Sequence, residues 1–132
     1  MRRVCIGSLV VVVVLATLPA HAHHSFGGTY NVDQKITIKG KIVQVTLRSP
    51  HSFLYVEVEN GNGSVERWTI EGAAASQFAQ QGIDKDAFKV GDPVEVIGNP
   101  SRSPNATRAR LIKITRTTDG KSWGGGAGEV VN

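Results

Sequence analysis

The sequence predicts an all-β fold: a small five-stranded OB-like Greek-key barrel with one short helix between the third and fourth strands. Three observations predict it. The chain has 132 residues, a length that suits one domain. Its 15 glycines and only 6% aromatic residues favour short strands and turns over long helices. Apolar residues alternate along five short segments, and one helical segment follows the third of them.

The first expected strand is long and covers residues 36–47. Its apolar residues alternate at Ile36 and Ile38, and the alternation changes phase between Ile42 and Val43. Gly40 stands just before this change. A glycine next to a change of register is typical of a β-bulge or a sharp bend, which a small barrel needs in order to turn a corner.

The second and third expected strands, 53–59 and 65–71, form a hairpin. The four residues between them, Asn-Gly-Asn-Gly at 60–63, favour a tight turn because both residue types tolerate positive φ. A helix is expected next, over 73–81. Gly82 then suits the left-handed position that commonly ends a helix.

The last two expected strands cover 94–97 and 108–117, and a glycine-rich tail over 121–132 is expected to be flexible. The order is therefore three strands, a helix and two strands, which is the order of an OB-type barrel. The competing interpretation is a small open sandwich.

The first 22 residues indicate a secretory signal peptide. A cationic start at 1–3 precedes an apolar run over 4–18, which is short for a membrane span. Pro19 breaks the run, and small residues then stand at Ala20 and Ala22, where a signal peptidase would require them. The alternative interpretation is an uncleaved N-terminal anchor.

Cleavage after Ala22 would leave a barrel domain over 23–120 and the tail. It removes Arg2, Arg3 and the single cysteine, Cys5, so 13 basic residues face 11 acidic ones and the net charge falls from +4 to +2. Scattered basic residues and a small charge argue against nucleic acid as a partner. The expected product is a soluble periplasmic or secreted protein without disulfides and without membrane contact after cleavage.

Three histidines of the mature chain predict a transition-metal site, with copper as the metal. His23 would be the first residue, and its α-amine and ring nitrogen can chelate one ion. His51, behind Pro50 in the loop after the first strand, is the candidate for a third nitrogen, and His24 would assist. Copper prefers such tetragonal nitrogen sets.

Two alternatives to this metal site remain open. Cleavage after Ala20 would place a histidine third, at His23, and would favour square-planar copper bound by the terminal amine, two backbone nitrogens and the His23 ring. The histidines can also be a frayed terminus and a surface loop, with no metal and no other cofactor.

A second candidate function is a metal-free OB-fold module that binds a small ligand or a periplasmic protein partner. Its candidate residues are Phe53 and Tyr55, which alternate on the outer face of the second strand. The competing interpretation places both rings under residues 25–27 or under Trp123.

The other polar residues predict no reaction. Tyr30 and Asp33 precede the first strand and could pack the N-terminal segment onto the barrel, whereas Glu71 would face either solvent or the mouth of the barrel. Neither a cysteine nucleophile nor a phosphate-binding glycine loop is present in the mature sequence, and Ser25 and Ser52 only neighbour histidines along the chain. We therefore expect a binding protein and not an enzyme.

Several short motifs stand along the chain; they are His23-His24-Ser25-Phe26, Tyr30, Asp33, Gly40, Pro50-His51-Ser52, Trp68, Glu71 and 91–94. Together they resemble a family of small exported bacterial proteins known only as a domain of unknown function. The resemblance covers roughly residues 22–120. Leu47 and Ser49 replace the tryptophan and asparagine that the family usually has before its Pro-His pair. The resemblance implies a periplasmic β-barrel and no established activity.

Overall fold

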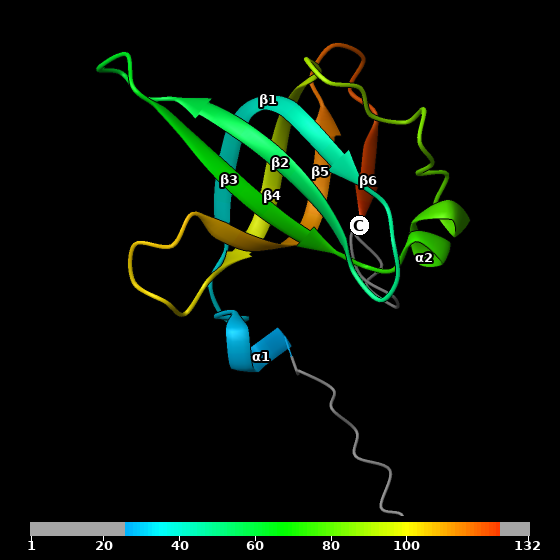
Figure 1. Ribbon diagram of the computed structural model, residues 1–132, viewed down its shortest axis with the longest axis horizontal. Helices are drawn as coiled ribbons and strands as arrows, with labels where there is room; N and C mark the ends of the chain where they lie inside the picture. Colours follow the sequence, from blue (N-terminus) through cyan, green and yellow to red (C-terminus); the bar gives the residue numbers. More distant parts are fainter. Residues whose placement is uncertain (1–25, 125–132) are drawn as a thin grey trace, which may run out of the picture.

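The computed structural model describes residues 26–124, which form a closed β-barrel with short helices at its edge (Figure 1). The strand order is β3-β2-β1-β4-β5-β6, and an additional parallel pairing of β3 with β5 closes the barrel over five strands. The predicted small all-β barrel is confirmed, and the open sandwich is wrong because β3 pairs with β5. The elements are α1 (Phe26–Thr29), β1 (Ile36–Thr46), β2 (Ser52–Glu59), β3 (Val65–Gly72), α2 (Ala75–Gln80), β4 (Pro93–Pro100), β5 (Arg108–Arg116) and β6 (Ser122–Gly124).

Strand β1 bends sharply, and its two halves pair with different neighbouring strands. Its first half, up to Lys41, pairs with β4, and its second half pairs with β2. The register with β2 shifts between Ile42 and Gln44, which confirms the predicted change of phase. Gly40 lies at the crossing, where an added Cβ would stand 2.1 Å from the backbone oxygen of Glu57. The bend therefore requires a residue without a side chain.

We expect Gly40→Ala to lower the free energy of unfolding by about 1–3 kcal/mol, because backbone must move to admit the methyl group. Urea denaturation measures this loss. Gly61→Ala is the matched control, since an added Cβ there meets nothing within 4 Å, and we expect a change within about 0.5 kcal/mol. Equal stabilities of the two variants would contradict the role assigned to Gly40.

The barrel interior is apolar and is closed at one end by the segment between β3 and β4. Phe78 of α2, Ile83 and Phe88 are all buried there. Trp123 of β6 meets Phe88 edge-on, with the ring centroids 4.6 Å apart. The buried residues contributed by the strands are Ile38, Ile42, Leu54, Val56, Ile70, Val94, Val96, Ala109, Leu111 and Ile114.

Several predicted boundaries are wrong. The expected helix over 73–81 is shorter, and the expected fourth strand over 94–97 extends to Pro100 after a register shift at Ile97. The expected tail begins too early, because Ser122–Gly124 pair with β5, where Trp123 packs on Phe88. The remaining tail residues, 125–132, and the expected signal peptide lie outside the described residues.

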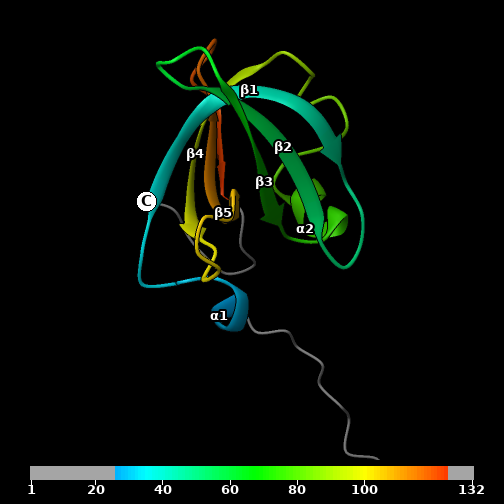
Figure 2. The same cartoon turned by 60° about the vertical axis from the view of Figure 1, so that its left-hand side comes forward.

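Helix α1 lies beneath the barrel, beside the loop that follows β4 (Figure 2). Arg102 from that loop joins the two, since its Nε donates to the carbonyl oxygen of Gly27 at 2.7 Å and its backbone N–H to that of Thr29 at 2.9 Å. This contact holds the N-terminal segment at the barrel end where the loop between β1 and β2 also lies.

Candidate functional site

His51 is oriented by a carboxylate at this end of the barrel. The β2–β3 register places Phe53 opposite Glu71, so the residue just before β2 reaches the end of β3. The Nδ1 atom of His51 lies 2.5 Å from Oε1 of Glu71. The hydroxyl of Ser52 bonds the backbone N–H and carbonyl of Arg48, which holds the loop that carries His51. The His51 side chain is 32% exposed and that of Glu71 is 10% exposed.

Glu71 joins three other side chains. It accepts hydrogen bonds from the Tyr30 hydroxyl and the Arg108 guanidinium in addition to its contact with His51. Burial by itself would raise the pKa of the Glu71 carboxyl, but the hydrogen bonds from Tyr30, Arg108 and His51 outweigh it and hold this pKa below its ordinary value. Glu71 is therefore a buried carboxylate whose charge is balanced by its partners.

Tyr30 connects the N-terminal segment to this carboxylate. Its backbone N–H donates to the carbonyl of Phe26 at 2.7 Å. Its backbone also pairs with that of Ser101 in a single antiparallel β-bridge. Its buried hydroxyl donates to Glu71 and accepts from Nε of Arg108 at 2.6 Å. Burial first, and then the Glu71 carboxylate, raises the pKa of the Tyr30 phenol well above its ordinary value, so the phenol remains a proton donor.

Phe26 brings the start of the described chain against His51. The centroids of the two rings are 5.3 Å apart. The Phe26 ring also lies 6.2 Å from that of Tyr30 and 4.4 Å from the guanidinium carbon of Arg110. The predicted metal ligands His23 and His24 lie outside the described residues, so of the predicted set the structure places only His51.

The sequence pattern indicates part of this cluster but not all of it. Tyr30 does attach the N-terminal segment, as expected, whereas Asp33 is exposed and takes no part. Glu71 faces the cluster at the mouth of the barrel, one of its two predicted positions. No pattern in the sequence distinguishes Arg108, because only the parallel pairing of β3 with β5 brings it beside Glu71. The alternation of β5 could at most have indicated that it points outward.

A family model described as a family of unknown function, DUF6152, matches residues 10–110. The chain belongs to this family. No curated protein matches it. The matched range of DUF6152 includes Tyr30, His51, Glu71 and Arg108, and it agrees with the predicted resemblance to a family of unknown function.

The two aromatic residues of the alternative binding face also lie at the surface. Phe53 and Tyr55 alternate with the buried Leu54 and Val56 and are half-buried on the outer face of β2. The guanidinium carbon of Arg48 lies 5.1 Å from the Phe53 centroid, and that of Arg67 lies 5.1 Å from the Tyr55 centroid. Trp123 packs on Phe88 instead, so one of the two predicted covers of this face is wrong. The other segment predicted to cover these rings is 25–27, and its first residue, Ser25, lies outside the described residues.

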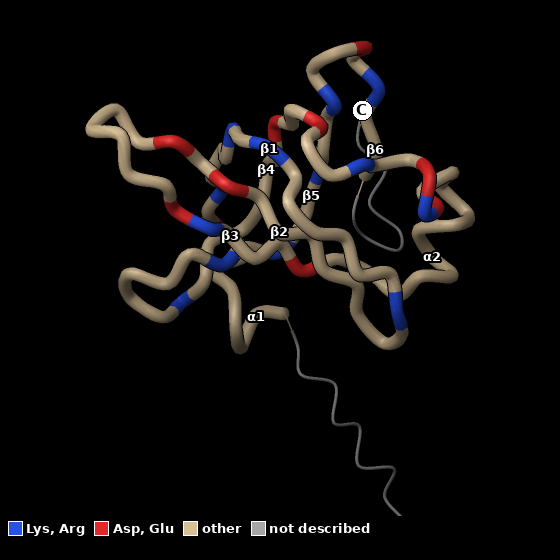
Figure 3. The backbone as a smooth tube through the Cα atoms, turned by 45° about the horizontal axis from the view of Figure 1, so that its top comes forward, with Lys and Arg blue, Asp and Glu red and all other residues tan. Residues whose placement is uncertain are grey.

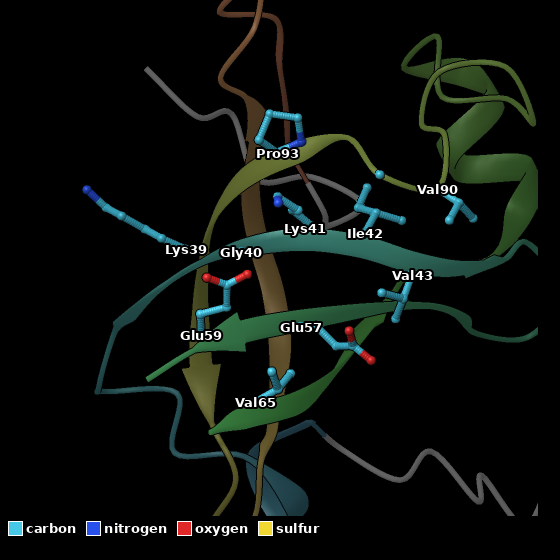
Figure 4. A pocket seen from close by; sticks show the side chains of 11 residues that line it. Lys39, Gly40, Lys41, Ile42, Val43, Glu57, Glu59, Val65, Val90 and Pro93 are labelled. Atoms are coloured by element: carbon cyan, nitrogen blue, oxygen red, sulfur yellow. The ribbon is translucent and has the colours of Figure 1, made fainter. Parts of the chain in front are cut away.

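A separate hollow of about 460 Å³ opens beside the bend of β1 (Figure 4). It does not overlap the His51 cluster. Its walls are Lys39–Val43, Glu57, Glu59, Val65, Val90, Gly91 and Pro93. Among residues 26–124, neither helix has the length and apolar character that crossing a bilayer demands. The same residues contain no group of three or more His, Cys, Asp or Glu side chains placed to hold a metal ion.

Proposed function

We propose that this DUF6152 protein is an exported binding protein of the bacterial periplasm that holds one copper ion, or another transition-metal ion, at His51. The other ligands in this proposal are the ring and α-amine of His23, with His24 assisting, after a signal peptide has been removed behind Ala22. It is a binding function and not a catalytic one.

The contact between His51 and Glu71 carries the proposal. A histidine that binds a metal through one ring nitrogen usually engages a carboxylate or carbonyl through the other, which sets the tautomer and the ring orientation. In His51 the Nδ1 atom makes this contact at 2.5 Å. The Nε2 atom is then the nitrogen left to bind a metal, on a ring that is one-third exposed.

The position of Phe26 supports the participation of the N-terminal histidines. Three Cα–Cα steps lead from His23 to Phe26, a span of at most about 11 Å at 3.8 Å between consecutive Cα atoms. Because the Phe26 ring packs on His51, the chain can return His23 to the same side of the barrel. Glu71 already engages three hydrogen-bonding partners through its two oxygens, so in this proposal it orients His51 and does not coordinate the ion.

Copper titration of protein that starts at His23 tests the proposal. We expect one Cu(II) per chain, and His51→Ala should weaken binding by at least about tenfold, since loss of an orienting partner alone can cost that much. An extra residue before His23 should weaken binding similarly, because the α-amine becomes an amide. His24→Ala is the matched control and should matter less. Affinity should fall at acid pH, where protons compete for the ligand nitrogens.

The mature N-terminus decides between the two cleavage sites and is read from the intact mass. Protein that starts at His21 should bind copper through its terminal amine, two backbone nitrogens and the His23 ring, so His51→Ala should not change its affinity. In protein that starts at His23, the contrary result is a copper affinity that is unchanged by His51→Ala and lost in His24→Ala. That result would assign the site to a flexible terminus, and the proposal would be wrong.

The second candidate function is the metal-free binding of a small ligand or a protein partner through Phe53 and Tyr55. It is favoured by the outward, half-buried position of both rings. Chelator treatment separates the two functions, because it removes a metal and leaves the aromatic face unchanged.

A further inference from the structure

Three arginines and three aromatic rings follow one another across the barrel end around His51. The guanidinium carbon of Arg108 lies 5.7 Å from the Tyr30 ring centroid and 6.0 Å from that of Phe53. Arg48 stacks on the same Phe53 ring, at 5.1 Å. We call this set the arginine–aromatic cluster; its members are Arg48, Phe53, Arg108, Tyr30, Phe26 and Arg110.

Two of these guanidinium groups have no acidic partner in the part of the chain that the structure describes. None of the five ion pairs among residues 26–124 involves Arg48 or Arg110. Arg108 uses Nε for Tyr30 and one terminal nitrogen for Glu71, and its side chain is 42% exposed. The cluster therefore presents positive charge that its own carboxylate does not neutralise.

Basic side chains of β5 lie at the same end of the barrel as this cluster. Arg108 and Arg110 stand two residues apart on β5, so both project from one face of the strand. Three acidic residues, Glu57, Glu59 and Glu66, lie along the β2–β3 hairpin, away from α1 (Figure 3), together with one basic residue, Arg67, opposite Glu57. The arginines without an acidic partner among the described residues therefore favour a negative ligand at the α1 end of the barrel over the hairpin, where acidic and basic residues stand opposite one another.

Stacking gives these arginines the geometry that recognises an oxyanion. A guanidinium lying on an aromatic ring keeps its planar edge free for a carboxylate or phosphate, which it can bind with two parallel hydrogen bonds. The ring also restricts the side chain before binding, so less conformational entropy is lost when a ligand arrives. Lysines scattered over a surface would offer neither property.

We propose that the arginine–aromatic cluster binds the carboxylate or phosphate groups of a small organic anion. Arg48 and Arg110, which lack an acidic partner among residues 26–124, contact the anion, and Arg108, held by Tyr30 and Glu71, packs against the Phe53 and Tyr30 rings of the cluster. The inference does not rest on the proposed metal site, and it assigns a ligand class to the surface that includes Phe53.

Calorimetric titration of the full, chelator-treated protein with citrate and with inorganic phosphate at low ionic strength tests the inference. We expect saturable binding of at least one anion that weakens as salt is added. Arg48→Gln and Arg110→Gln should each weaken it by about tenfold, the cost of one charge-assisted hydrogen bond. Arg110→Lys should restore part of the affinity, because it keeps the charge but loses the planar fork.

Lys85→Gln is the matched control, because it removes the same charge from an exposed turn between α2 and β4. Circular dichroism and thermal melting of each variant show that the fold is retained. Binding of citrate alone assigns a carboxylate ligand, and binding of phosphate alone assigns a phosphate ligand. The inference is overturned if neither anion binds, if both arginine variants behave like Lys85→Gln, or if a single-stranded oligonucleotide binds where both small anions fail.

Discussion

Replacing Glu71 with alanine should lower the free energy of unfolding by about 2–4 kcal/mol at neutral pH. The loss is large because Glu71 is the common partner of Tyr30, His51 and Arg108. Its removal leaves the buried Tyr30 hydroxyl without its acceptor and Arg108 without its counter-charge. The value lies below that of a fully buried ion pair because the Arg108 side chain is 42% exposed and remains partly hydrated.

The stabilisation by Glu71 should depend on pH with a definite sign. The pKa of its carboxyl is lowered in the folded state relative to its ordinary value of 4.5. The carboxylate therefore stabilises the fold above that value, and this stabilisation is lost as the pH falls through the lower, folded-state pKa. The neutral isostere Glu71→Gln lacks this contribution at every pH.

Chemical denaturation at neutral pH and at about pH 3 measures the stability that Glu71 contributes and its dependence on pH. The stability difference between the native protein and Glu71→Gln should shrink in acid. Glu59→Gln, the same change at an exposed position at the end of β2, should behave like the native protein throughout. A constant difference between native protein and Glu71→Gln at both pH values would show that the carboxylate charge contributes nothing to the fold.

Replacing Phe78 with alanine should cost about 3–5 kcal/mol, the usual cost of removing a buried phenylalanine. The Phe78 side chain is 1% exposed and is the buried residue of α2. Its ring also packs on the backbone of Gly72, where an added Cβ would stand 2.3 Å from Cζ. The variant leaves a cavity between α2 and the end of β3.

Urea denaturation measures the effect of Phe78→Ala, and Val90→Ala serves as the control because Val90 is 71% exposed. The control should change stability by no more than about 0.5 kcal/mol. A loss below about 1 kcal/mol for Phe78→Ala would mean that α2 does not unfold together with the barrel.

The local features of this fold were readable from the order of residues. The hairpin turn at 60–63 forms as expected, with Gly63 at φ 81°. Gly82 adopts φ 77° after α2, and the Ile83 that follows it is buried. The bend of β1 occurs where the apolar alternation changes phase. Turn chemistry and apolar periodicity depend on neighbouring residues, so the sequence carries them directly.

The boundaries that were missed depend on partners far along the chain. Strand β6 is held in place by the packing of Trp123 on the Phe88 ring. Strand β4 extends to Pro100 because Asn99 pairs with Arg110 on β5. No local pattern in 98–100 or 121–124 reports on those partners. Glycine and proline in these segments favour a loop until the barrel supplies a neighbouring strand.

The chemistry of the candidate site was assembled only by the tertiary structure. His51 could be named in advance because histidine is the usual nitrogen ligand of transition metals. Its orientation could not, because Glu71 is 20 residues away and is itself held by Tyr30 and Arg108 at separations of 41 and 37 residues. The β2–β3 register, the parallel β3–β5 pairing and the Tyr30–Ser101 bridge bring these four side chains together. Such contacts form only when the barrel closes. The sequence therefore determines which residue types are available, whereas the strand pairing of the closed barrel determines which of them meet.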